Sequence, residues 1–414
     1  MPPRPLILAL LAAACAAPRA ASLDNAAARA DLSAQMVETL DRQQHYFADD
    51  DRRRAFGERM SEIAREASDA RSFYEAASLA LAGLGEGHTA LVGSPEVPFT
   101  ATIPPVALLE VEGAVVVAGV APGVEGGGLR EGDLLLAVDG APVDETLARR
   151  FGETPGSTPH GRRARAVANL LAGPTATPAR VAVRGADGRE RECFPLRFLL
   201  DDEGEDRFRF GFLPATLTAM RVSAAAGYLH LPDFHPDRIE ELETALEAFR
   251  ELPTLVLDLR GNPGGRIQTL QRIAGLFLGD AADLVSLVQQ RRTEMLRSAP
   301  CERPYRGKLR VLIDERTGSA AELLAAALQD LGRALLVGRP TAGSTRSRLS
   351  SVLPGGVTFH YAGASEFRRG DGRPIEGTGV RPDLIVIPTR EGLARGEHGD
   401  PYRDPAVRTA LDRN

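Results

Sequence analysis

The sequence has 50 basic side chains, and only one of them, Lys308, is a lysine. The others are arginines, which stay protonated in proteins and cannot act as a neutral base. Only three cysteines are present, and no cysteines and histidines share the spacing of metal ligands, so we expect no metal site and no cofactor. The formal net charge of −6 argues against a nucleic-acid partner.

Long apolar runs are also missing, except near the N-terminus. After Arg4, an apolar run of about 13 residues is too short to span a bilayer and is typical of a secretory signal. We therefore predict a signal peptide over residues 1–22 and export to the periplasm or the medium. The motif Ala12-Ala-Ala-Cys15 resembles a bacterial lipobox. Attachment to the membrane through a lipid on Cys15 and simple cleavage both remain open.

The chain of 414 residues is long enough for two or three domains, each with its own core. Its 43% apolar and 26% charged residues are typical of a soluble protein. Cys193 and Cys301 could form a disulfide in an oxidising compartment, but spacing alone does not establish a pairing.

The hydrophobic pattern changes twice along the chain. Between residues 24 and 85, apolar positions recur at helical spacing and predict three helices, the last over residues 72–84. Short β runs and glycines follow to about residue 200. Later strands alternate with helices of about a dozen residues, which predicts a largely parallel sheet with functional residues at the carboxyl ends of its strands. The expected strands are 226–231, 255–259, 309–314 and 334–337, and the expected helices between them include 238–252 and 267–278.

Ser319 follows the predicted strand 309–314 through a short turn and opens a long apolar helix. A serine at such a turn exposes its hydroxyl near the unpaired N–H groups of the helix, which suits a nucleophile. Serine is equally a favoured helix cap, and Glu322 would complete a capping box with it. The turn by itself allows either role.

A second segment joins the predicted strand 255–259 to the loop Arg260-Gly-Asn-Pro-Gly-Gly265, whose glycines allow close approach to the backbone. Together with Gly318-Ser-Ala-Ala-Glu322, this loop resembles the core of the carboxyl-terminal processing and tricorn-core serine peptidases. The resemblance covers about residues 30–410. The resemblance implies that Ser319 is the nucleophile. It also implies an oxyanion hole in which the N–H of Ala320 and the N–H of Gly264 or Gly265 donate hydrogen bonds to the oxyanion.

The base that activates Ser319 is not a lysine if the predicted strand is correct. The processing-peptidase branch carries its lysine after the helix, where this chain has Gly338-Arg-Pro-Thr-Ala-Gly-Ser344 and therefore Ser344 at the lysine position. Lys308 begins the strand whose other end leads to Ser319. Six residues at about 3.3 Å each separate the two by roughly 20 Å.

The Thr-Ala-Gly ending of that segment resembles the tricorn-like branch, in which a histidine and a glutamate assist the serine. His88 lies in a matching motif, Gly85-Glu-Gly-His-Thr89, and the resemblance implies that it is the general base. Glu376 precedes the final Gly-Val-Arg-Pro-Asp segment and is implied to orient the imidazole. As alternatives, His88 could be a solvated loop residue and Glu376 a surface carboxylate. One departure from the pattern is Gly87, where the tricorn-like branch has a serine.

Residues 128–143 resemble the hairpin of a PDZ domain, a module that binds peptide ends by adding a strand to a sheet edge. A β module that only braces the catalytic domain is the alternative.

We therefore predict an α/β multidomain protein with five segments: signal peptide 1–22, N-terminal helical region 23–98, PDZ-like β domain 99–203, βα catalytic domain of the ClpP/crotonase-like type 204–398 and C-terminal segment 399–414. The expected function is an exported serine endopeptidase or tail-processing peptidase acting on unfolded or C-terminally exposed polypeptides. The alternative is an inactive peptide- or lipid-binding protein that retains the fold, as in interphotoreceptor retinoid-binding protein. The sequence leaves the oligomeric state open.

Overall fold

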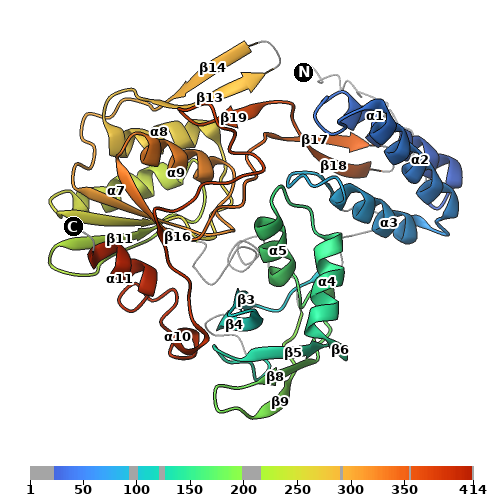
Figure 1. Cartoon of the computed structure of the whole chain (residues 1–414), viewed down its shortest axis with the longest axis horizontal. Coiled ribbons are helices and arrows are strands. Elements are labelled where there is room, and N and C mark those ends of the chain that lie inside the picture. The colour runs from blue at the N-terminus through green and yellow to red at the C-terminus, as the bar shows by residue number, and fades with distance from the viewer. Residues whose placement is uncertain are drawn as a thin grey trace, which may run out of the picture.

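The structure is a computed structural model that describes residues 23–92, 101–120, 126–197, 216–289, 292–353 and 356–412. The predicted signal peptide and Cys15 lie outside these residues. Figure 1 shows three parts, a group of N-terminal helices, a β domain and a larger βα domain. They follow one another in the predicted order, so the predicted fold class is confirmed.

The N-terminal part consists of three helices, as predicted: α1 (Ala26–Asp41), α2 (Asp50–Glu66) and α3 (Ala70–Ala82). Each begins after an Asn or Asp whose side chain accepts a hydrogen bond from a free backbone N–H of the first turn. Their apolar faces share a core with Phe359 of β18 (Val357–Ala362), which pairs with β17 (Arg348–Leu353). Strand β1 (Ala90–Val92) also pairs with β18. The loop before β1, which carries His88, is thereby tied to the C-terminal half of the chain.

The β domain contains a sheet in the order β3-β4-β5-β8-β9, so β3 is an edge strand. Helix α5 packs along β3 and lies on the side of the domain that faces the βα domain in Figure 1. Cys193 at the end of β9 is buried, and neither it nor Cys301 forms a disulfide. The elements of this domain are β2 (Ala101–Thr102), β3 (Val106–Val111), β4 (Ala114–Val120), β5 (Leu134–Val138), β6 (Ala141–Pro142), α4 (Val143–Glu153), α5 (Pro159–Ala168), β7 (Gly173–Pro174), β8 (Val181–Arg184) and β9 (Glu190–Cys193).

The βα domain contains the four predicted strands as β11, β12, β15 and β16. They belong to a sheet in the order β10-β11-β12-β15-β16-β20, parallel from β11 onward. Successive residues of a strand face opposite sides. Leu255 and Leu257 pack with α7, α8 and α9, whereas Val256 packs with the last helix, α11. The elements are β10 (Thr218–Arg221), β11 (Ala226–His230), α7 (Arg238–Phe249), β12 (Thr254–Asp258), α8 (Ile267–Leu278), β15 (Lys308–Ile313), α9 (Ala320–Asp330), β16 (Ala334–Gly338), β20 (Leu384–Ile385), α10 (Arg390–Ala394) and α11 (Pro405–Asp412).

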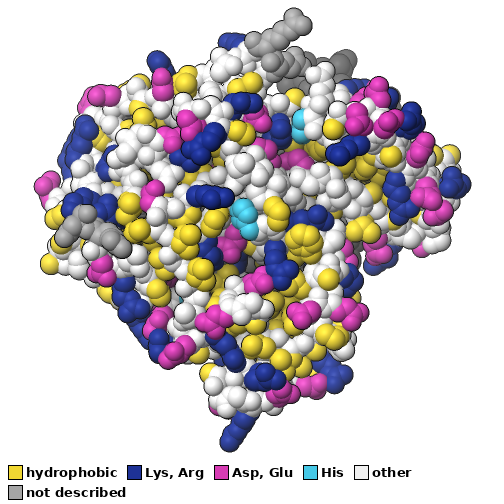
Figure 2. Space-filling model, viewed as in Figure 1, with side chains coloured by type: hydrophobic (Ala, Val, Ile, Leu, Met, Phe, Trp, Pro, Cys, Tyr) yellow, Lys and Arg dark blue, Asp and Glu magenta, His cyan; other side chains and the backbone are white. Residues whose placement is uncertain are grey.

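One small sheet of this domain was not predicted. It contains β13 (Asp283–Gln289), β14 (Arg292–Arg297) and β19 (Glu366–Arg368), and its hairpin β13–β14 projects from the domain in Figure 1. Across the described residues, no helix combines the length and apolar character needed to cross a bilayer. Side chains of both charges are intermixed over the face drawn in Figure 2.

A buried ion network joins the C-terminal segment to the end of β12. Arg260 forms two hydrogen-bonded ion pairs, with Asp258 at 2.6 Å and with Asp404 at 2.9 Å, and all three side chains are at most 4% exposed. Tyr228 donates to Asp258 at 2.8 Å. Burial would raise the pKa of Asp404, but the charge of Arg260 and the hydrogen bond from His398 outweigh burial and hold this pKa well below its usual range. The network fixes the backbone from which the Gly261–Gly265 loop departs.

We predict that Asp404→Asn destabilises the protein by about 3 kcal/mol at pH 7, because it leaves the Arg260 charge partly unpaired in the interior. The folded-state pKa is depressed, so the contribution of Asp404 is present above its unfolded pKa of about 4 and is lost as the pH falls. Thermal unfolding of wild type and variant should therefore converge at low pH. Asp371→Asn, in an exposed pair with Arg373, is the control and should change the Tm little. A constant difference between wild type and Asp404→Asn down to pH 2 would contradict this account.

Candidate active site

The turn between β15 and α9 is held by hydrogen bonds to the neighbouring strand end. Asp314 accepts from the backbone N–H groups of Gly261, Arg316 and Thr317 at 2.9 to 3.1 Å. The Thr317 hydroxyl donates to the carbonyl of Leu259 at 2.8 Å. Burial would raise the pKa of Asp314, but Arg316 and Arg339 hold it below its usual value. The turn before Ser319 and the loop after β12 therefore form one rigid unit.

The backbone of Ser319 has φ 51° and ψ −124°, in the left-handed half of conformational space. An ordinary capping serine has a negative φ in the extended region. Holding a non-glycine residue in such a conformation costs of order 1 to 3 kcal/mol, and such strain gathers at functional sites. Helix capping alone does not account for this geometry.

Glu322, in the first turn of α9, is completely buried and links the Ser319 turn to the segment after β16. Its carboxylate accepts from the Ser319 N–H at 3.0 Å, as the capping motif predicted. It also accepts from the Thr341 hydroxyl and from the N–H groups of Gly343 and Ser344, at 2.5 to 2.9 Å. Burial raises the pKa of Glu322 to about 7, although these donors act in the opposite direction. All four partners donate, so the ionised form fits the site best.

The glycine loop lies directly against the start of α9. A Cβ atom on Gly264 would be 2.7 Å from the Ala320 nitrogen and 2.8 Å from the Ser319 Cβ, so only glycine fits there. The Gly264 N–H donates to Asn262 Oδ1 at 2.8 Å. Among the described residues, no acceptor takes the N–H of Gly265 or of Ala320. These two amides remain available to a ligand.

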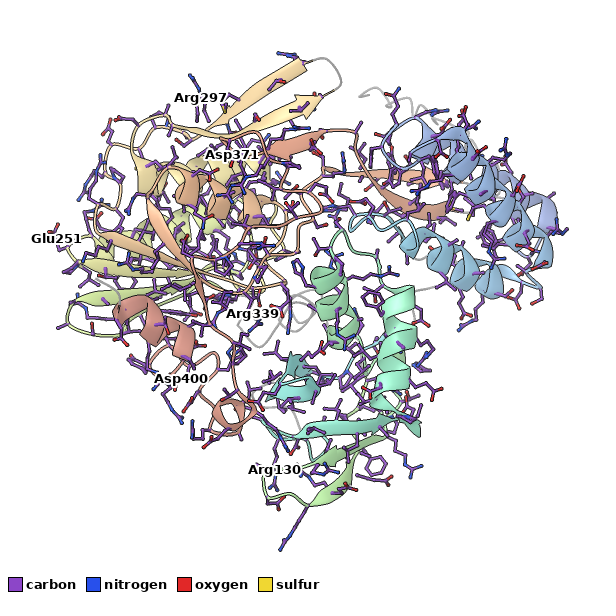
Figure 3. All side chains as sticks on the ribbon, in the orientation of Figure 1. Arg130, Glu251, Arg297, Arg339, Asp371 and Asp400 are labelled. Atoms are coloured by element: carbon purple, nitrogen blue, oxygen red, sulfur yellow. The ribbon has the colours of Figure 1, made fainter. Side chains whose placement is uncertain are left out.

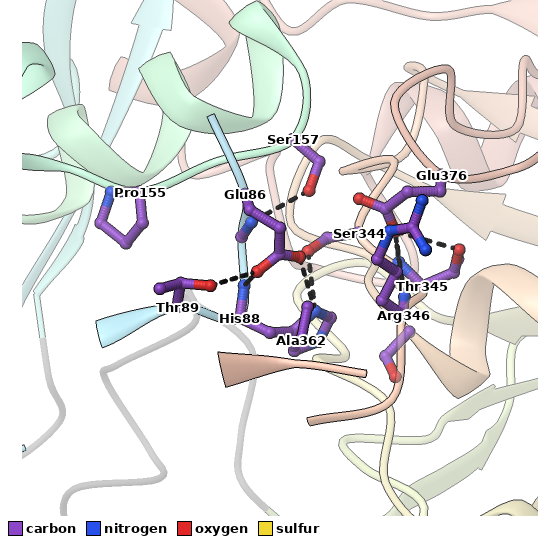
Figure 4. A network of polar contacts seen from close by, with 12 residues as sticks. Glu86, His88, Thr89, Pro155, Ser157, Ser344, Thr345, Arg346, Ala362 and Glu376 are labelled. Atoms are coloured by element: carbon purple, nitrogen blue, oxygen red, sulfur yellow. Dashed lines mark hydrogen bonds and ion pairs between the residues drawn. The ribbon is translucent and has the colours of Figure 1, made fainter. Parts of the chain in front are cut away.

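His88 is brought to the Ser319 turn from the N-terminal part of the chain. Its Nδ1 lies 3.4 Å from the Ser344 hydroxyl and 3.5 Å from Glu86 Oε1 (Figure 4), and its side chain is 14% exposed. Ser344 in turn accepts from the Ser319 N–H at 3.0 Å through its carbonyl. Burial would raise the pKa of Glu86, but hydrogen bonds from His88 and Thr89 and the attraction of His88 lower it overall. His88 thus contacts Ser344 and Glu86, two residues to which sequence reasoning assigned no role in the site.

Glu376 occupies a different position from the one expected. Its carboxylate accepts from the N–H groups of Thr345 and Arg346 at 2.6 and 2.9 Å (Figure 4). Glu86 is the carboxylate that lies within 4 Å of a His88 ring nitrogen among the described residues. Glu376 thus fixes the segment that carries Ser344, and the structure shows no direct contact with the imidazole.

Lys308 is the first residue of β15, as predicted, and is exposed. The six residues of this strand extend about 20 Å at about 3.3 Å each, which puts the ammonium group at the far edge of the sheet from Ser319.

The β domain contacts both loops of the site through α5 and the two residues directly before it. Ser157 accepts from the Gly87 N–H at 3.0 Å, and Arg165 donates to the Gly87 carbonyl at 2.9 Å. Thr158 donates to the Ala342 carbonyl at 2.7 Å. Burial lowers the pKa of Arg165, while the nearby carboxylates of the site oppose this effect. The β domain is therefore part of the frame that holds His88.

A pocket of about 160 Å³ lies between β3, α5 and the turn that precedes Ser319. Arg163 of α5 pairs with Glu110 of β3 across it, at 2.5 and 2.8 Å. Arg316 of the turn donates to the Leu108 carbonyl on the edge strand β3 at 2.9 Å. Glu315 is held by Arg339, labelled in Figure 3, at 2.6 Å. The edge of the β domain and the serine turn share this pocket.

Residues 225–386, in the C-terminal half of the chain, match the profile of peptidase family S41. The chain is 32% identical over 174 residues to a carboxyl-terminal-processing protease of Synechocystis, a match that covers 42% of this chain and 40% of that protein. It is 29% identical over 296 residues to a protein of Streptomyces coelicolor named as a tricorn protease homolog, covering 69% of this chain and 22% of that one. The chain thus spans less than two thirds of the length of either relative.

The solved structure of mature CPAF in complex with lactacystin has the same fold. It superimposes with a TM-score of 0.70 and covers 92% of this chain and 98% of the CPAF chain, at 17% identity. At this identity the likeness shows the fold alone.

We predict that Gly264→Ala abolishes any reaction at Ser319, because the added methyl would contact Ala320 N and Ser319 Cβ at less than 3 Å and because φ is 94°. Gly372→Ala is the matched control, since Gly372 has φ 83° and open space around it. Both substitutions strain the backbone, but only the first should remove activity. Equal activity of the two purified, folded variants would show that the glycine loop is not part of the site.

Proposed function

We propose that this protein is a serine peptidase that hydrolyses polypeptides and uses Ser319 as its nucleophile. The observation that carries the proposal is the strained backbone of Ser319, at the carboxyl end of a parallel strand and beside two amides without an acceptor. The match of residues 225–386 to the profile of peptidase family S41 supports it.

In this mechanism the Ser319 hydroxyl oxygen attacks the peptide carbonyl carbon, and His88 accepts the hydroxyl proton. The carbonyl oxygen becomes an oxyanion that the N–H groups of Ala320 and Gly265 stabilise, each donor typically contributing about 3 kcal/mol. Because the Gly264 N–H already donates to Asn262, we assign the second donor to Gly265. His88 then returns its proton to the leaving amine, and water releases the acyl group from Ser319.

Glu376 supports this chemistry indirectly. It holds the Thr345 and Arg346 amides and so fixes the segment in which Ser344 contacts His88. We therefore retain Glu376 in the proposed site as a positioning residue.

The rival is a binding protein that keeps the fold without catalysis. A binding protein needs no strained serine, no unpaired amides beside it and no histidine held near the same turn. Because these three features occur together in this structure, they favour an enzyme over a binding protein.

We further propose that the β domain is PDZ-like and recognises the carboxyl end of the substrate, and that the protein is exported. Strand β3 is a sheet edge with α5 beside it, the arrangement to which a peptide adds as a strand. The pocket between them carries Arg163, a cation that would exchange its pair with Glu110 for a terminal carboxylate.

The function is tested by hydrolysis of an unfolded polypeptide. Ser319→Ala and His88→Ala should each lower kcat by several orders of magnitude, as loss of a triad member typically does. Lys308→Arg should keep wild-type activity, because Lys308 lies at the far end of β15. Activity that survives His88→Ala but not Lys308→Arg would refute the assignment of the base.

Recognition of the carboxyl end is tested with paired peptides that differ only in amidation of the C-terminus. We expect the free acid to be cleaved with the higher kcat/KM, and Arg163→Gln to reduce this preference. Arg180→Gln, in an exposed pair with Glu192 on the same domain, is the control. Equal kcat/KM for both peptides would leave the β domain only a structural role.

A further inference from the structure

Gly87, directly before His88, has no room for a side chain. A Cβ atom there would lie 2.1 Å from the Ser344 hydroxyl oxygen and 3.1 Å from the Ser344 Cβ. The φ of Gly87 is not positive, so backbone conformation does not require a glycine. The space beside the histidine is filled instead by a hydroxyl from a residue 257 positions later in the chain. Gly87 and Ser344 are therefore complementary in volume.

Ser344 is itself held firmly and contacts both the backbone of Ser319 and the His88 ring. Its N–H donates to Glu322 at 2.9 Å, and its carbonyl accepts from the Ser319 N–H at 3.0 Å. Only 2% of the residue is exposed. The next two amides of the chain are bound by Glu376. The position of the Ser344 hydroxyl is thus fixed relative to Ser319 by the backbone on both sides.

The groups around His88 Nδ1 determine which ring nitrogen can act as a base. Glu86 Oε1 is a carboxylate oxygen that finds no hydrogen-bond partner among the described residues, and the Ser344 hydroxyl can accept a hydrogen bond. With acceptors on this side, the proton of the neutral imidazole belongs on Nδ1. Nε2 then keeps its lone pair for a proton from Ser319.

We propose that Ser344, together with Glu86, is the group that orients the His88 imidazole and fixes its tautomer. Ser344 does so from the position that a lysine occupies in the processing-peptidase pattern. The Ser344 hydroxyl takes the place of the side chain that Gly87 lacks, and Glu376 acts on the imidazole through the segment that carries Ser344. This inference rests on the proposed function, because it assigns a positioning role in that reaction.

The first experiment measures kcat, KM and the pH dependence of kcat/KM for Ser344→Ala. We expect kcat to fall about 10- to 100-fold, the effect of losing one hydrogen bond to a charged group, with KM nearly unchanged. The acidic limb of the pH profile should move to lower pH, because the imidazolium loses one acceptor. Ser350→Ala is the matched control. Its hydroxyl lies 2.7 Å from His360 Nδ1 on the β17–β18 hairpin, and its removal should leave all three quantities unchanged.

The second experiment exchanges the residues at positions 87 and 344. Gly87→Ser alone should lower kcat about 100-fold or more, because its Cβ collides with the Ser344 hydroxyl and displaces His88. Ser344→Gly alone removes the hydroxyl. The double variant Gly87→Ser with Ser344→Gly supplies a hydroxyl from the other side of the same space. It should recover at least about tenfold over either single variant, a coupling that independent sites do not show.

The outcomes separate this inference from the proposed function. If Ser319→Ala is inactive while Ser344→Ala keeps wild-type kcat and pH profile, the function stands and the role of Ser344 is refuted. If the double variant shows only the sum of the two single losses, the exchange is refuted as well. If the wild-type protein hydrolyses no polypeptide, the proposed function and this inference fall together. Matching Tm values of folded variants exclude unfolding as the cause of lost activity.

Discussion

The buried carboxylate of Glu322 is the interaction on which the arrangement of the site depends. It accepts one hydrogen bond from the turn that carries Ser319 and three from residues 341–344. Without it, three donors would be left in the interior without acceptors, the Thr341 hydroxyl and the N–H groups of Gly343 and Ser344, each at a cost of about 1 to 3 kcal/mol. The carboxylate therefore joins two segments that otherwise approach only through backbone contacts, and it places Ser344 beside Ser319.

The same site is assembled from all three parts of the chain. The N-terminal part supplies His88, and β1 pairs with β18 directly after that loop. The β domain holds the backbone on both sides of Gly87 through Ser157 and Arg165. The βα domain supplies Ser319 and the glycine loop. Because each part contacts the others at the site, a change in the position of the β domain would alter the position of the imidazole as well.

Much of this arrangement could be predicted from local sequence patterns. Strand and helix periodicity gave the helix Ile267–Leu278 and placed Lys308 at the start of β15, and both are confirmed. The small sheet of β13, β14 and β19 was not predicted, because β14 is mostly exposed and because β13 pairs with β19 about 80 positions later in the chain. The contact of Glu86 and Ser344 with His88 was also missed. It depends on packing between the loop before β1 and the segment after β16, and no local pattern reports such packing.

Glu376 is a second residue whose contacts could not be predicted from the sequence pattern around it. The motif around this residue matched, and the carboxylate does lie near the site, but its hydrogen bonds go to Thr345 and Arg346. Motif spacing identifies residues that lie close together at a site. The direction in which a carboxylate points depends instead on which hydrogen-bond donors surround it in the folded chain.

The central claim is that Ser319 is the reactive group, and covalent modification tests it most directly. After treatment of the folded wild-type protein with a fluorophosphonate, peptide mass spectrometry should locate one adduct, on Ser319, and the adduct should disappear in Ser319→Ala. An adduct on Ser344, or a protein that hydrolyses polypeptides while Ser319 stays unmodified, would contradict the account.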